Sequence, residues 1–155
     1  MRSKFLVLLA LFAASCAEAG AWGYGTFEND DALDWLSQLE STSGTQLLEA
    51  TVRQVDTRAK YVEAATCSIA LAAAEVVATT IGHGPKNLPS EVAVWIKRVR
   101  PTVSAALLLE ARAAVEMCRN PKNSELRELW KESKDEKLWL DDTASLLARL
   151  GGPVV

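Results

Sequence analysis

The sequence is poor in the residues that most metal-binding and catalytic frameworks require. It has one histidine and three cysteines in 155 residues, which excludes the common zinc sites built from several histidine and cysteine ligands. Its net charge is -3 and it has no block of lysines and arginines, which argues against nucleic acid as a partner. It also lacks a nucleophile–base motif and a glycine-rich phosphate loop. We therefore expect no catalytic residues, no metal and no cofactor.

The N-terminal segment has the pattern of a secretory signal peptide. Arg2 and Lys4 precede an apolar run over residues 5–14, which is shorter than the roughly 20 residues that span a bilayer. The triplet 17–19, Ala-Glu-Ala, is a small-x-small cleavage site. We expect cleavage after Ala19, which leaves residues 20–155 as one exported domain, periplasmic or secreted and without a transmembrane segment.

A lipoprotein is the alternative interpretation of the same segment. Residues 13–16, Ala-Ala-Ser-Cys, resemble a lipobox, in which Cys16 would carry the lipid and become the new N-terminus. Ala13 stands where such boxes usually have leucine, so the sequence favours the signal peptide.

Helical periodicity recurs throughout residues 20–155, and no stretch alternates long enough to predict a strand. Asn29 is the expected N-cap of the first helix, because Asp30 and Asp31 follow in its first turn. We expect an all-α, compact single-domain bundle of five or six helices around a long alanine-rich central helix. The predicted helices cover residues 30–40, 45–81, 90–98 (capped by Ser90), 103–119, 124–132 and 135–150.

The predicted central helix sets an expectation for the two cysteines after the leader. Residues 64–81 are apolar on all sides apart from Glu75, so this part should be packed by neighbours on several sides. If the chain turns back near Gly84, Cys67 lies level with Ala105, and Cys118 is about 18 Å further along. A disulfide needs a much shorter separation. The sequence therefore favours two buried free thiols, and a bridge remains the alternative, through a kink at Pro101 or through another helix.

Several stretches resemble a known bacterial family, domain of unknown function 4259. They are the opening WGYGTFENDDALDW at 22–35, AAAEVVA at 72–78, NSELRELW at 123–130 and the terminal residues 146–150. The similarity runs in the same order over nearly all of the chain after residue 19. It implies a small helical domain that often begins directly at Gly-Ala-Trp, in agreement with cleavage before Gly20. It implies no activity, ligand or catalytic residue.

The opening of that motif contains the strongest candidate ligand-binding residues. Its carboxylates suggest either a site for calcium or magnesium or a groove for a cationic partner. The architectural alternative, which we favour, makes Phe27 a hydrophobic staple, Asn29 a cap and the aspartates partners of the helix dipole. The candidates are Trp22, Glu28, Asn29, Asp30, Asp31, Asp34 and Trp35.

Glu75, Glu110, His83 and the helix 124–132 are further candidates for a functional role. Glu75 and Glu110 each interrupt an apolar helix, so they are either acid–base groups in one pocket or structural partners of Arg112, Arg98 or Arg100. His83 lies between two glycines and is best interpreted as an exposed turn residue. The helix 124–132 has one charged and one apolar face, which suits either solvent or a partner helix.

The sequence thus favours a non-enzymatic binding or interaction domain of the bacterial cell envelope with a protein partner. The alternative is a small hydrolase-like enzyme that uses Glu75, Glu110 or the carboxylates between Glu28 and Asp34.

Overall fold

The computed structural model describes residues 21–151, and within them the chain forms seven helices and no strand. The all-helical prediction is confirmed, with seven helices in place of five or six. Two isolated bridges lie outside the helices: Ala21 pairs with Asn29 within the segment before the first helix, and Val62 pairs with Ser124. The helices are α1 (Asp30–Glu40), α2 (Gln46–Gln54), α3 (Ala64–Thr80), α4 (Ser90–Val99), α5 (Ala105–Cys118), α6 (Glu125–Lys131) and α7 (Glu136–Arg149).

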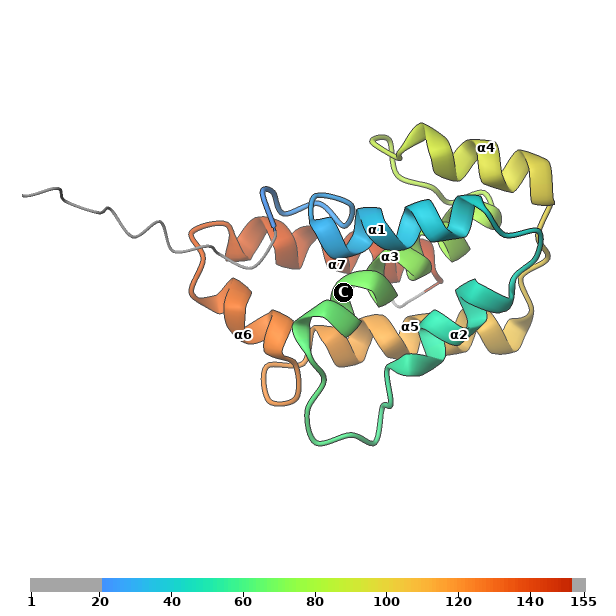
Figure 1. Cartoon of the computed structure of the whole chain (residues 1–155). Coiled ribbons are helices and arrows are strands. Elements are labelled where there is room, and N and C mark those ends of the chain that lie inside the picture. Colours follow the sequence, from blue (N-terminus) through green and yellow to red (C-terminus); the bar gives the residue numbers. More distant parts are fainter. Residues whose placement is uncertain (1–20, 152–155) are drawn as a thin grey trace, which may run out of the picture.

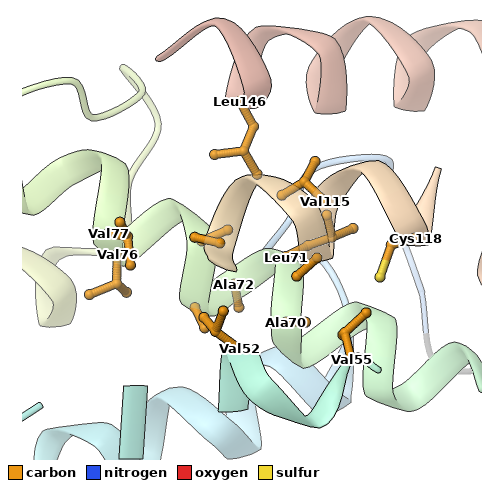
Figure 2. Close-up of a cluster of buried hydrophobic side chains, with 14 of the residues drawn as sticks. Val52, Val55, Ala70, Leu71, Ala72, Val76, Val77, Val115, Cys118 and Leu146 are labelled. Atoms are coloured by element: carbon orange, nitrogen blue, oxygen red, sulfur yellow. The ribbon is translucent and has the colours of Figure 1, made fainter. Parts of the chain in front are cut away.

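Helix α3 is the centre of the bundle (Figure 1), in contact with α1, α2, α5, α6 and α7. Every residue from 70 to 78 is buried, because small side chains let the neighbouring helices approach from several sides. Figure 2 shows Val76 and Val77 of α3 in the same core as Val52 of α2, Val115 of α5 and Leu146 of α7. The prediction of an alanine-rich central helix is confirmed.

The predicted single helix over residues 45–81 is wrong, because the chain leaves helical geometry at Val55 and returns to it at Ala64. The intervening loop is held by a distant segment. The Val62 N–H donates to the Asn123 carbonyl at 2.8 Å, and the Glu125 N–H donates to the Val62 carbonyl at 3.0 Å. Val55 and Val62 are both buried. Buried apolar residues therefore continue at helical spacing through the loop. For this reason the periodicity of the sequence does not reveal the break between the two helices.

Other helix ends follow from local side-chain hydrogen bonds. Asn29 is the N-cap of α1, as predicted, since its Oδ1 accepts from the Ala32 N–H at 2.8 Å. Ser124 caps α6 in the same way. The capping role predicted for Ser90 is wrong, because Ser90 is the first residue of α4 and its hydroxyl donates to Glu91. Arg100, in a left-handed conformation with φ of 50°, ends α4 just before Pro101.

Cys67 and Cys118 form a disulfide, with 5.4 Å between their Cα atoms, so the prediction of two free thiols is wrong. Cys67 lies in the first turn of α3 and Cys118 is the last residue of α5. The prediction failed because it assumed a tight hairpin at Gly84. The whole of α4 lies between α3 and α5, so α5 is displaced along α3 until the two cysteines come level.

Within residues 21–151, no helix has the length and apolar character that crossing a bilayer requires. The predicted signal peptide and the lipobox at Cys16 lie outside the described residues, as do residues 152–155.

Candidate functional site

The N-terminal loop, residues 21–29, folds back on itself before α1. The Trp22 N–H donates to the Glu28 carbonyl at 3.1 Å, and the Glu28 N–H donates to the Gly25 carbonyl at 2.9 Å. Glu28 Oε2 accepts from the Gly25 N–H at 2.8 Å. A Cβ atom at Gly23 or Gly25 would collide with the Glu28 carboxylate. The two glycines therefore leave the space that the Glu28 carboxylate occupies in the loop.

The N-terminal loop is also attached to the rest of the bundle. The Asn29 side-chain amide donates to the Thr26 carbonyl at 3.1 Å, while its oxygen caps α1. The Thr26 hydroxyl lies 3.4 Å from Asp142 Oδ2 of α7, to which it donates. Burial raises the pKa of Asp142 above its ordinary value, while the Thr26 hydrogen bond lowers it. These contacts hold the loop beside α7 (Figure 1).

A groove runs between the N-terminal loop and α6. One part of it, a hollow of about 360 Å³, lies over the start of α3. A second hollow of about 430 Å³ shares Ala21, Leu126 and Leu129 with the first, so the two form one continuous depression. Trp130 of α6 and Trp139 of α7 stack at its base, with ring centroids 5.9 Å apart. We call this depression the N-terminal groove.

The walls of the N-terminal groove carry large apolar side chains that the core leaves exposed. Trp22 is 60% exposed, Tyr24 is 41% exposed and Leu129 is 45% exposed. Single exposed apolar residues are common on any protein surface, whereas several around one depression are typical of a contact surface.

Carboxylates outnumber cationic groups among the described residues that line the groove. Asp31, Glu125, Glu132 and Asp135 line it together with Lys134. Glu125 also has a structural role, since its Oε2 accepts from the Ala64 N–H at 2.7 Å, at the start of α3. This position suits a carboxylate because the first N–H groups of a helix lack partners inside the helix.

The candidate residues predicted from the sequence have different roles in the structure. Glu28 and Asn29 stabilise the N-terminal loop, while Asp30 and Asp34 are exposed on α1. Trp35 is buried, and its indole N–H donates to the Thr51 hydroxyl at 2.8 Å. The candidates that line the groove are Trp22, Asn29 and Asp31. Within residues 21–151 no three histidine, cysteine, aspartate or glutamate side chains are grouped closely enough to hold a metal ion.

Glu75 is paired with Arg149 rather than with the arginines considered from the sequence. Its Oε1 and Oε2 accept from the two terminal nitrogens of Arg149, each at 2.6 Å. Burial raises the pKa of Glu75, while the hydrogen bonds and the charge of Arg149 oppose that rise. His83 Nδ1 lies 2.8 Å from the Arg149 carbonyl oxygen, and the residue is exposed as predicted.

Glu110 lies elsewhere, with its Oε2 3.0 Å from Nε of Arg53, and the pair is exposed to solvent. Glu75 and Glu110 are therefore bound to different arginines and do not face one another. Neither lines the N-terminal groove. The hypothesis of two carboxylates in one pocket is wrong for this pair.

Sequence reasoning missed most of the groove. Leu129 and Trp130 of α6 both line it, and Leu129 remains exposed while Trp130 stacks against Trp139. Tyr24 and Trp139 gave no signal, because the groove exists only once α6 and α7 lie beside the N-terminal loop. The sequence contained two hints: the opening motif, which includes the lining residues Trp22, Asn29 and Asp31, and the amphipathic pattern of α6.

These features define a small all-α domain that is cross-linked through α3 and α5 and has an apolar groove beside its N-terminal loop. The chain belongs to the family described as "Domain of unknown function (DUF4259)", whose family model matches residues 20–142. The resemblance found in the sequence is thereby confirmed. No curated protein and no solved structure matches the chain.

Proposed function

We propose that this protein is an exported, non-enzymatic binding domain of the bacterial envelope and that it contacts a protein partner through the N-terminal groove. The observation that supports the proposal is the set of exposed apolar side chains on the groove, Trp22, Tyr24 and Leu129. Covering the exposed part of Trp22 alone contributes about 3 kcal/mol at 25 cal/mol per Å². A surface of this kind is costly to leave in water without a partner.

The construction of the groove also supports binding. Its lining includes the first turns of α3 and the Trp130–Trp139 stack, while Glu28 and Asn29 hold the N-terminal loop closed. A preformed surface loses little conformational entropy when it binds, so more of the contact energy appears as affinity.

Two observations support export. The first is the disulfide between Cys67 and Cys118, because such bonds persist in oxidising compartments and are rare in the cytosol. The second is that the family match begins at residue 20, directly after the predicted cleavage site at Ala19. The proposed mature protein is one domain over residues 20–155, and a lipid anchor at Cys16 is the alternative.

Photo-crosslinking in the organism that encodes the protein tests the groove. A photoreactive phenylalanine analogue replaces Leu129, and the control carries it at Val94 of α4, which is 62% exposed and outside the groove. We expect position 129 to give a discrete adduct with one partner protein in a one-to-one composition, and we expect Trp22→Ala to abolish this adduct. Equal labelling from both positions, or an adduct that Trp22→Ala leaves unchanged, would refute the proposed function.

Cell fractionation with mass spectrometry of the intact protein tests export. We expect the protein outside the cytoplasm, with Gly20 as its first residue and with Cys67 and Cys118 oxidised. A chain that retains residues 1–19 in the cytoplasm would refute export. A protein that leaves the membrane only after Cys16→Ser would establish the lipoprotein alternative.

A further inference from the structure

We propose, on the basis of the proposed binding function, that the N-terminal groove recognises a cationic segment of its protein partner. In this segment lysine or arginine side chains flank apolar anchors. The proposal depends on which groups of the groove are already satisfied within the bundle and which remain free to act on a ligand.

The apolar anchors are expected to contact the base and walls of the groove. Leu71 of α3 and Leu126 of α6 are buried beneath the first hollow, so they form an apolar floor. Trp22 and Leu129 stand exposed at the second hollow. Burial of apolar surface is the non-directional part of recognition, and by itself it does not select a charge.

The carboxylates of the groove fall into two groups. Glu125 accepts a backbone hydrogen bond from Ala64, so its position is explained by the fold. Asp31 and Glu132 are exposed. Within residues 21–151 their carboxylates make no hydrogen bond or ion pair.

The balance of charge along the lining favours a cation. Among the described lining residues, the carboxylates without a structural role are Asp31, Glu132 and Asp135, and the cationic side chain is that of Lys134. Carboxylates at the rim of an apolar contact attract partners of opposite charge and repel partners of like charge, which gives specificity and a faster association. An acidic partner or an anionic lipid surface is therefore disfavoured at this groove.

The aromatic side chains point to the same class of partner. Trp22 and Tyr24 are exposed on the N-terminal loop beside these carboxylates. The face of an indole or phenol ring attracts lysine and arginine side chains, and the attraction adds to that of nearby carboxylates. The same segment of the partner is thus selected by two different features of the groove.

Three synthetic peptides of about four helical turns test the proposal. Each has leucines on one face, and the other positions are all lysine in the first peptide, all glutamine in the second and all glutamate in the third. The protein is expressed as the full chain and purified after any natural processing. Fluorescence anisotropy gives the dissociation constant of each peptide at low and at physiological salt. We expect the lysine peptide to bind about tenfold more tightly than the glutamine peptide at low salt, with a smaller difference at higher salt. The glutamate peptide should be the weakest.

A matched pair of variants separates the groove from the overall charge. Asp31→Asn with Glu132→Gln should remove most of the preference for lysine over glutamine. Glu40→Gln with Glu91→Gln removes the same number of charges from exposed positions on α1 and α4, away from the groove, and should leave the preference intact. If both double variants lose it equally, the preference comes from net charge and the proposal is wrong.

The outcomes distinguish this inference from the function on which it rests. If the lysine and glutamine peptides bind equally and Trp22→Ala weakens both, the groove binds apolar segments and only the charge preference is refuted. If no peptide responds to Trp22→Ala and position 129 gives no specific adduct in cells, the proposed function itself is refuted. Tightest binding of the glutamate peptide would overturn the inference directly.

Discussion

Replacing Cys67 and Cys118 together by alanine is expected to lower the free energy of unfolding by about 4 kcal/mol. The disulfide joins residues that are 51 positions apart, and a cross-link of that span removes an entropy from the unfolded chain that amounts to about 4 kcal/mol at 25 °C. Natural domains have only about 5–15 kcal/mol of stability in total. We therefore expect the variant to fold but to melt roughly 15 °C below the wild type.

Alanine is the appropriate replacement because both cysteines are fully buried. A pair of serines would add the cost of burying two hydroxyl groups and would confuse the measurement. Urea unfolding followed by far-ultraviolet circular dichroism gives the free energy of unfolding for the wild type and for the double variant. The wild type is also measured after reduction in denaturant and refolding, since a reductant cannot reach this bond in the folded state.

Reduction should shift the wild-type transition toward that of the double variant and should leave the double variant unchanged. Thiol alkylation with mass spectrometry confirms that both sulfurs are free in the reduced sample. If the reduced and oxidised forms unfold at the same urea concentration, the bond does not restrict the unfolded chain as argued, and the reasoning from loop length is refuted.

Two further predictions concern buried charge. Glu75→Gln leaves Arg149, which is half-buried, without its carboxylate partner, and should cost about 2–3 kcal/mol in urea unfolding. The control Glu110→Gln breaks the exposed pair with Arg53 and should cost less than about 0.5 kcal/mol; equal losses would contradict this assignment. Because burial raises the pKa of Asp142, the native state takes up a proton at a higher pH than the unfolded chain, so stability falls as pH rises from about 4 through that raised value. Asp142→Asn should reduce this fall, and an unchanged pH profile of unfolding would show that Asp142 is not responsible.

Local patterns were sufficient for much of the secondary structure. The cap at Asn29 and the bounds of α1 could be predicted because a helix N-terminus is determined by neighbouring residues. The apolar stretch that became α3 could be recognised because a segment without a polar face has to be surrounded. The family itself could be identified because its motifs are contiguous in the chain.

The candidate site could be predicted only in part. The opening motif supplied the candidate residues of the N-terminal loop, but it did not separate the side chains that build the loop, such as Glu28, from those that line the groove, such as Trp22. That distinction depends on where each side chain points after α6 and α7 have packed beside the loop. No spacing within the motif contains this information.

The sequence by itself determined that this protein is helical, where its first helix begins and which helix lies at the centre, because periodicity and capping depend on residues a few positions apart. Tertiary structure alone decided the break between α2 and α3, the pairing of Cys67 with Cys118 and the choice of Arg149 as the partner of Glu75. Each of these depends on contacts between residues that are far apart in the chain. Such contacts depend on the packing of whole helices against one another, and that packing also creates the N-terminal groove.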